Sequence, residues 1–541
     1  MRSVFSTSVT WLLASSLIST AQAASSPQHV AERVDEAIAT EVFADRTAES
    51  ALELAPRCDD ETFLRRAYLD IVGDIPAPEA AIAFLLDPSS DKRQRLVQQL
   101  LDDPHYGQNW ARYWRDVVFF RAQEDRARIA ANAMVVDLAD QLNDNQGWDT
   151  IASKFITAKG DVRENGHTAI IMAQDGRTEE TTAEISRIFL GIQIQCAQCH
   201  DHPYDRWKRE QFHELASFFP RIAVRNVRDM TKRSFEVYSN DRYDKRKRKA
   251  PNNDRRPVAE HRMPDLDQPE VPGQVMLPRF FLTSAELAPG RRDAERREQL
   301  ADWLTDNEWF AIAIVNRMWS ELVGEGFYEP VDDIGPDREA TAPTAVKLLA
   351  GGFQDSGHDL KWLLATIMET AAYQREARPR RGPTGTSLVA NVPQRLRSDQ
   401  LFNALFTALD VEEQVGRGSG YGGPRASGPR AEFAELFGYD PSTARESIAA
   451  TIPQSLALMN AYEVNRYLRA TNKNLLGGLI EAVTDDEALV VELYLRCLSR
   501  EPDDEELAGA LEYCAEIRRR DEAFEDLLWV LINSAEFQHR R

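Results

Sequence analysis

The sequence of 541 residues contains no uninterrupted apolar run close to the roughly 18 to 20 residues that a membrane-spanning helix needs. It also has no net positive charge, because 87 acidic residues outnumber 65 basic ones and give a formal charge of −22. Nucleic acid and anionic membrane surfaces both favour a partner with a basic surface. The sequence therefore predicts no transmembrane segment in the mature chain and no nucleic-acid partner.

Common hydrolase signatures are missing as well. The chain has no nucleophile elbow, no phosphate-binding loop and no H-E-x-x-H zinc-protease motif. These absences make a hydrolase the weakest functional hypothesis, and they leave open whether the protein is an enzyme. Hydrophobic residues make up 43% of the chain and charged residues 28%, which is typical of folded proteins. The length predicts two to four domains.

The N-terminus has the pattern of a signal peptide. Arg2 supplies a short positive region, residues 9–18 form an apolar stretch, and Ala21-Gln22-Ala23 is an A-x-A cleavage site. We expect residues 1–23 to be removed and the mature chain to begin at Ala24. The protein is therefore predicted to be exported to a periplasmic or extracellular space, where an unidentified redox or cell-envelope protein is the expected partner.

Cysteine is scarce, with five in the chain, and two of the five stand in the most informative motif. Cys196, Cys199 and His200 form C-x-x-C-H, the pentapeptide of covalent c-type haem attachment. Two thiols at this spacing can each form a thioether with one vinyl group of the porphyrin, and the adjacent imidazole then binds the iron as the proximal ligand. The motif predicts haem c as the cofactor, bound by these three residues.

The same stretch allows two other interpretations. His202 follows closely, so Cys196, Cys199, His200 and His202 form an alternative zinc-ligand set, with His213 on the next helix as a fifth candidate. Four ligands within seven residues would strain the loop. The other alternative is a local disulfide, or a pair of buried thiols, beside a hydrogen-bonded His200. In either case the protein would be a structural protein or would bind a partner or polysaccharide.

A haem would need an apolar slot beside His200, and the aromatic residues nearest in sequence are candidates to line it: Phe189, Trp207 and Phe212. No methionine lies in a pattern that identifies a sixth iron ligand. The downstream candidates are Met230, Met263, Met276 and His261.

The other three cysteines are Cys58, Cys497 and Cys514. Cys497 and Cys514 lie on two consecutive predicted helices, where the helical rise separates them by roughly 10 Å along the hairpin. This separation exceeds disulfide reach. All three are therefore predicted to be buried structural thiols.

Apolar periodicity predicts a mainly α fold with two helical domains and an irregular, weakly β connector. The predicted parts are a helical lead-in at 24–50, a helical domain at 51–220 that contains the C-x-x-C-H motif, a connector at 221–280 with a strand at 235–238, and a C-terminal helical domain at 281–541. The basic run at 245–249 and the Gly- and Pro-rich stretches at 376–390 and 414–430 are predicted to be loops.

Two further patterns are more typical of structure than of chemistry. An aromatic stripe at helical spacing predicts a packed helix face and is formed by Tyr106, Trp110, Tyr113 and Trp114. The adjacent carboxylates of Asp332 and Asp333 could bind calcium, but such a pair more often caps a helix or pairs with a nearby arginine.

The two ends of the chain share a pattern. RAYLDIVGDIPAPE in the N-terminal part aligns without gaps with ELYLRCLSREPDDE in the C-terminal part, and each begins a predicted helical hairpin. Similar helix endings occur at 100–106, 367–373 and 531–537. These similarities predict a helical module that is used at both ends of the chain.

Several long segments resemble a known family. The planctomycete cytochrome-type domain has a haem-motif region similar to SRIFLGIQIQCAQCHDHPYDRWKREQFHELASFF and an N-terminal part similar to FLRRAYLDIVGDIPAPEAAIAFLLD and LLDDPHYGQNWARYWRD. Its usual partner domain of unknown function resembles MPDLDQPEVPGQVMLPRFFLT, LADWLTDNEWFAIAIVNRMWSELVGEGFYEPVDDIGP and HDLKWLLATIMETAAYQR. The resemblance implies export and a C-x-x-C-H motif at Cys196, Cys199 and His200. It implies no particular reaction.

Overall fold

The computed structural model describes residues 25–43, 54–227, 233–241, 259–268, 270–379, 388–413, 428–444, 448–460 and 462–541. Within these residues the fold is mainly helical, which confirms the predicted fold class. The signal-peptide residues, the basic run at 245–249, Met230 and most of the two predicted loops lie outside the described residues. No helix in the described part of the chain is long and apolar enough to cross a membrane.

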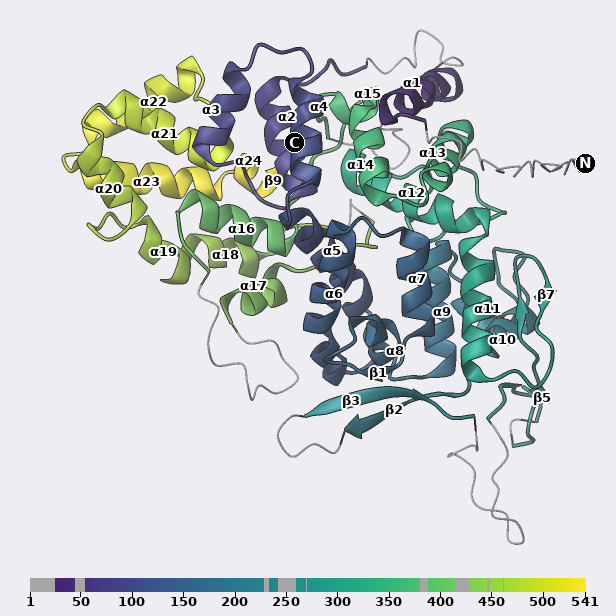
Figure 1. The fold of residues 1–541 in the computed structure, drawn as a ribbon. Helices are drawn as coiled ribbons and strands as arrows, with labels where there is room; N and C mark the ends of the chain where they lie inside the picture. The colour runs from purple at the N-terminus through teal and green to yellow at the C-terminus, as the bar shows by residue number, and fades with distance from the viewer. Residues whose placement is uncertain are drawn as a thin grey trace, which may run out of the picture.

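The N-terminal half is a succession of short helices (Figure 1). These are α1 (Pro27–Ile38), η1 (Ala39–Phe43), α2 (Asp60–Ile71), α3 (Pro78–Leu86), α4 (Lys92–Leu101), α5 (His105–Phe119), η2 (Asp125–Ala130), α6 (Ala131–Asn143), α7 (Trp148–Thr157), η3 (Gly166–Thr168), α8 (Ala169–Ala173), α9 (Thr178–Leu190), η4 (Gln195–Gln198) and α10 (Arg209–Ala216).

The strands are short. β1 (Gly160–Asp161), β2 (Ile222–Val227) and β3 (Ser234–Ser239) form one antiparallel sheet in the order β1-β3-β2, so the strand predicted at 235–238 is confirmed. Antiparallel pairs are also formed by β4 (Arg262–Met263) with β5 (Gln274–Val275), and by β6 (Arg279–Phe280) with β7 (Ala285–Glu286).

Helices resume after β7. They are α11 (Asp293–Thr305), α12 (Glu308–Val323), α13 (Pro343–Asp355), α14 (Leu360–Glu369), α15 (Ala371–Gln374), α16 (Ser398–Ala408), α17 (Pro429–Phe437), α18 (Ile452–Asn460), α19 (Tyr462–Leu468), α20 (Leu475–Ala482), α21 (Asp486–Leu498), α22 (Asp504–Glu516), α23 (Arg520–Asn533) and α24 (Ala535–Gln538). The strands β8 (Gln394–Arg395) and β9 (His539–Arg540) pair with each other.

Two large hydrophobic cores hold these elements together. The first contains residues from Val30 to Leu388, and so it draws on both of the predicted helical domains. The predicted aromatic stripe on α5 is part of this core, since all four rings are at most 4% exposed. The second core contains residues from Leu396 to Phe537 together with Leu69 and Ile75 of the N-terminal part. The C-terminal helices therefore pack beside α2 and α3 (Figure 1).

The predicted repeat corresponds to two matching helical hairpins. α2 and α3 form the first, and α21 and α22 form the second. The endings at 367–373 and 531–537 also agree in detail: α15 and α24 are each a single turn, and the hydroxyls of their N-cap residues, Thr370 and Ser534, accept hydrogen bonds from the third helical residue. The structure therefore confirms two similar hairpins at opposite ends of the chain.

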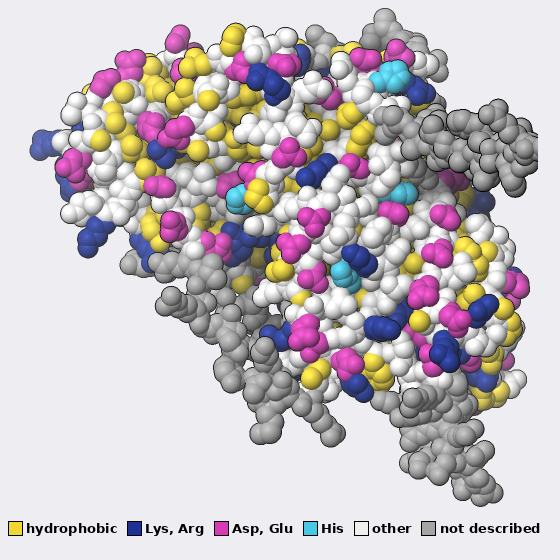
Figure 2. All heavy atoms as spheres, viewed as in Figure 1, with side chains coloured by type: hydrophobic (Ala, Val, Ile, Leu, Met, Phe, Trp, Pro, Cys, Tyr) yellow, Lys and Arg dark blue, Asp and Glu magenta, His cyan; other side chains and the backbone are white. Residues whose placement is uncertain are grey.

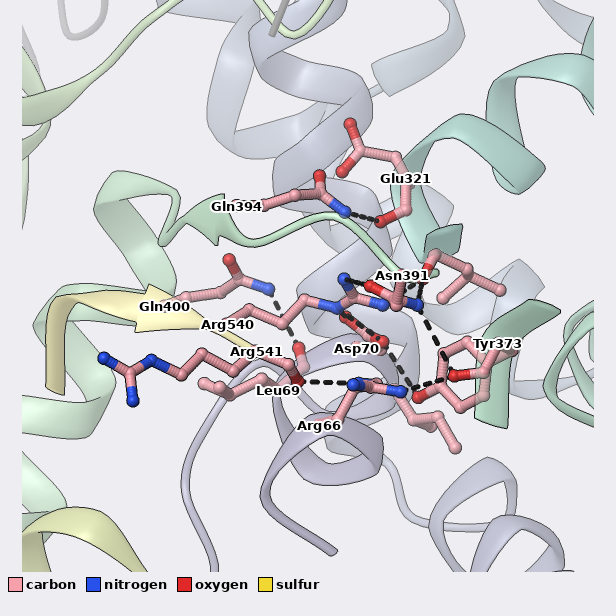
Figure 3. Close-up of polar contacts among 12 residues, drawn as sticks. Arg66, Leu69, Asp70, Glu321, Tyr373, Asn391, Gln394, Gln400, Arg540 and Arg541 are labelled. Carbon is pink, nitrogen blue, oxygen red and sulfur yellow. Dashed lines mark hydrogen bonds and ion pairs between the residues drawn. The ribbon is translucent and has the colours of Figure 1, made fainter. Parts of the chain in front are cut away.

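A buried polar network fastens β9 to four other segments (Figure 3). Arg540 Nε donates to both carboxylate oxygens of Asp70 on α2, at 2.6 and 2.9 Å, and its Nη1 donates to Asn391 at 2.9 Å. Its Nη2 donates to the carbonyl of Leu322 at the end of α12. Tyr373 of α15 donates its hydroxyl proton to Asp70 at 2.9 Å. This network joins the two cores.

The surface carries many charged side chains, as the 28% of charged residues in the sequence leads one to expect. Figure 2 shows acidic and basic side chains interspersed over one face of the molecule. Asp332 and Asp333 pair with arginines, as the sequence favoured: Asp332 lies 2.9 Å from Arg187 and Asp333 lies 3.2 Å from Arg338. Burial raises the pKa of Asp332, but Arg187 and two further arginines outweigh this effect and lower it overall.

Candidate functional site

The C-x-x-C-H motif lies in a loop that begins where α9 ends. Gly191 closes the helix with φ of 67°, and a Cβ atom at this position would lie 2.7 Å from the Ile334 side chain. Glycine is the residue that fits such a left-handed cap against a close neighbour. The chain then passes through buried Ile192 and Ile194 into the 3₁₀ turn η4. The local backbone therefore places the motif at the molecular surface.

Both motif cysteines are exposed and neither forms a disulfide. His200 is exposed too, and its Nδ1 lies 2.7 Å from the carbonyl oxygen of Asp201. A carbonyl oxygen only accepts, so Nδ1 carries the proton and Nε2 of the neutral ring has a free lone pair. A backbone hydrogen bond of this kind is the usual way in which a metal-binding histidine is oriented.

His202 has a different environment. Its side chain is only 6% exposed, and its Nδ1 accepts a hydrogen bond from the backbone N–H of Asp205 at 3.0 Å. In the neutral His202 ring the proton therefore sits on Nε2. This is the opposite of His200, whose Nε2 has a free lone pair. His202 organises the turn that follows the motif. Among the described residues no group of three or more His, Cys, Asp or Glu could hold a metal ion, so the alternative zinc set is not brought together.

The aromatic residues expected to line a slot are packed in the first core. Phe189 lies 5.9 Å from Trp148 between ring centroids, Trp207 lies 4.9 Å from Phe281, and all three predicted lining residues are at most 3% exposed. An exposed aromatic side chain does occur beside the motif, because Tyr204 is 83% exposed. The thiols and His200 Nε2 fit the donor set of haem c, and their surface position leaves them accessible for attachment.

A pair of buried histidines supports the loop from beneath. His213 of α10 donates from Nε2 to the carbonyl oxygen of Gln198, between the two cysteines, at 3.0 Å. Its Nδ1 lies 2.8 Å from Nε2 of His261, and His261 Nδ1 lies 3.9 Å from Glu179. Burial, followed by the nearby His261, lowers the pKa of His213 to about 4. Nδ1 of neutral His213 therefore accepts a hydrogen bond from Nε2 of His261. The two histidines thus connect Glu179 to the backbone of the motif at Gln198.

Sequence reasoning missed this role for both histidines. It treated His213 as a fifth zinc-ligand candidate and His261 as a possible sixth iron ligand. In the structure Nε2 of His213 donates to the Gln198 carbonyl, and Nε2 of His261 donates to His213. Of the methionine candidates, Met276 is 3% exposed and Met263 lies half-buried in β4. The two histidines are 48 positions apart, and no local pattern marks them as a pair.

The segment at 332–338 holds the motif loop from the other side. Ile334 donates its backbone N–H to the carbonyl oxygen of Gly191 at 2.8 Å. Arg206 Nε donates to both carboxylate oxygens of Asp337 at 2.9 Å, and Arg338 lies 3.1 Å from Asp205. The loop is thus fixed by residues that lie more than 120 positions further along the chain.

Two family models match parts of the chain. Residues 33–224 match the family model PSCyt2, a protein of unknown function (DUF1549), and residues 296–432 match PSD1, a protein of unknown function (DUF1553). These matches confirm the predicted planctomycete-type pairing. The PSCyt2 region contains the motif, and the PSD1 region contributes the segment that holds it. No curated protein and no solved structure matches the chain.

The remaining cysteines are partly as predicted. Cys58 and Cys497 are buried, which confirms the prediction, but Cys514 is half-buried and the prediction of a buried thiol is wrong there. The reason is that α22, which carries Cys514, has no fully buried residue in the described structure. All three thiols are free.

Proposed function

We propose that this chain is an exported c-type haem protein that carries out electron transfer or a haem-dependent redox step. The observation that carries the proposal is the state of the motif: two exposed, unpaired thiols next to an imidazole whose Nδ1 is fixed by a backbone carbonyl and whose Nε2 is free. This is the donor set that covalent haem attachment requires.

The C-x-x-C-H spacing, together with the geometry around it, supports the proposed role of each residue. Cys196 and Cys199 are the thioether anchors, and His200 is the proximal ligand through Nε2. Haem, when bound, supplies a one-electron redox centre. His213 is a positioning residue, because its hydrogen bond to Gln198 fixes the backbone between the two anchors. Lys208 and the N–H of Arg209 hold Asp201, whose carbonyl orients His200.

The first experiment tests for the haem itself. The full chain is exported in a host that attaches haem to C-x-x-C-H sequences, next to a Cys196→Ala/Cys199→Ala control. We expect a Soret band with reduced α and β bands, and a haem stain that stays with the denatured chain and is lost in the control. N-terminal sequencing of the exported protein tests cleavage before Ala24.

A colourless wild-type protein would contradict the proposal. Metal analysis and thiol counting of the same sample would then separate the two remaining alternatives. One zinc per chain would support the site formed by Cys196, Cys199, His200 and His202, and two lost thiols without metal would support a disulfide. Both results would favour a structural protein or one that binds a partner or polysaccharide.

A further inference from the structure

A cavity of about 370 Å³ lies between the two halves of the chain, away from the C-x-x-C-H loop. One wall comes from α5, η2 and α6, within the PSCyt2 match, and the other comes from α16 and α17. Its volume is within the range of small-molecule sites, roughly 300 to 1,000 Å³, and such sites favour the interface between two structural units. The cavity therefore has the size and the place of a ligand site.

Charged groups of both signs line this cavity or lie directly behind its lining. Arg115 Nη2 lies 2.7 Å from a carboxylate oxygen of Asp116 and 2.7 Å from one of Asp399. Arg430 also reaches Asp399, at 3.2 Å, and donates to Asn403 at 2.7 Å. Asp116 and Asp399 are thus held by arginines that also line the cavity. The charges are balanced, so the lining offers both hydrogen-bond donors and acceptors without a strong net field.

One buried hydroxyl beside the cavity lacks a partner. Ser398, the first residue of α16, is 3% exposed, and its buried Oγ makes no hydrogen bond. Leaving such a group unsatisfied is unfavourable, and a ligand that hydrogen-bonds to it would recover this energy. The remaining lining is mixed: Phe119, Phe120 and Ala434 are among its apolar residues, and its polar residues are Asp125, Arg128, Asn132 and Glu435. Small-molecule sites combine apolar surface with polar groups that fix the orientation of the ligand, and this cavity has both.

We propose that this cavity binds a neutral, hydroxyl-rich molecule of the size of a mono- or disaccharide. Each hydroxyl of such a ligand both donates and accepts, which matches the mixed lining of carboxylate, guanidinium and seryl groups. A negatively charged ligand would be repelled by Asp116, and a positively charged ligand would be repelled by Arg115 and Arg430. The apolar residues would cover the carbon-bearing faces of the ring. This proposal is independent of haem attachment.

The test measures binding to the full mature chain by calorimetry and by saturation-transfer NMR. The probes are maltose, cellobiose, lactose and sucrose, with glucuronate and glucosamine as charged analogues. We expect at least one neutral disaccharide to bind at millimolar or lower concentration. Ser398→Ala and Asp116→Asn should each weaken binding about tenfold, and Asn132→Trp, at an exposed lining position, should block the cavity.

Ser455→Ala is the matched control, because Ser455 is an exposed helical serine outside the cavity. It should bind like the wild type. Unchanged melting temperatures of Ser398→Ala and Asn132→Trp would show that weaker binding is not caused by misfolding. The proposal is overturned if no neutral probe binds at 50 mM, if the charged analogues bind as tightly, or if Asn132→Trp binds like the wild type.

Discussion

Asp70 and Arg540 lie 470 positions apart in the chain, yet Arg540 Nε contacts both carboxylate oxygens of Asp70, at 2.6 and 2.9 Å. Both side chains are 4% exposed. Arg66 extends the same network, since its Nε donates to the carbonyl oxygen of Arg541 at 2.6 Å (Figure 3). The first helix of the N-terminal hairpin and the last strand of the described chain are therefore joined through a buried ion pair.

Removing one partner of this pair should destabilise the protein strongly. Arg540→Ala leaves Asp70 buried without its cation, and breaking a buried pair in this way typically costs about 3 to 5 kcal/mol. We expect a lower urea midpoint, measured by tryptophan fluorescence. Arg541→Ala is the matched control on the neighbouring residue, because its side chain is 52% exposed and only its carbonyl contacts Arg66. Equal midpoints for the two variants would contradict the prediction.

The stability of the wild type should fall in weak acid because of His213. Its folded-state pKa of about 4 lies below the value of about 6.5 for an unfolded histidine, so the unfolded chain binds more protons between these pH values. The contribution of neutral His213 to the free energy of unfolding is complete above pH 6.5, and it decreases as the pH falls toward 4. The change is roughly 3 kcal/mol at most.

His213→Gln keeps a donor for Gln198 and removes the titration. Urea unfolding at pH 7, 5.5 and 4.5 should show that the variant loses less stability than the wild type on acidification. His29→Gln, at an exposed position on α1, should follow the wild-type curve. Parallel curves for wild type and His213→Gln would show that His213 does not titrate in this way.

Two glycine substitutions should have opposite effects. Gly191→Ala places a Cβ 2.7 Å from Ile334 at a left-handed position, so it should destabilise the motif loop by at least about 1 kcal/mol. Gly351→Ala lies within α13, where a Cβ meets no atom within 4 Å. It should stabilise the helix by about 0.5 to 1 kcal/mol. Thermal unfolding checks both; a loss of stability in Gly351→Ala would refute the second.

Thiol reactivity should follow burial when the chain is produced reduced and without haem. Cys196 and Cys199 are exposed and should react first with an aromatic disulfide reagent at pH 8, followed by half-buried Cys514. Cys58 and Cys497 should react only after unfolding, because burial also raises the pKa of the Cys497 thiol to about 12. Mass spectrometry of labelled peptides gives the order. Early labelling of Cys497 would contradict the described packing.

Much of the candidate site could be predicted from short stretches of the sequence. The C-x-x-C-H spacing, the end of α9 at Gly191 and the helix that follows the motif all come from neighbouring residues. The different states of His200 and His202 were not readable, because each depends on which backbone group its Nδ1 meets. The expected slot residues were misplaced for a similar reason: an apolar ring can line a cofactor or fill a core, and only its neighbours decide.

The sequence by itself determined the mainly helical fold, the matching hairpins at both ends and the motif, since these depend on periodicity and spacing within short segments. Tertiary structure decided the rest. It brought His261 to His213, Asp337 to Arg206 and Arg540 to Asp70, and it formed the cavity beside Ser398. Side chains so distant in sequence meet only when packing of apolar surfaces fixes the path of the whole chain, which no local pattern encodes.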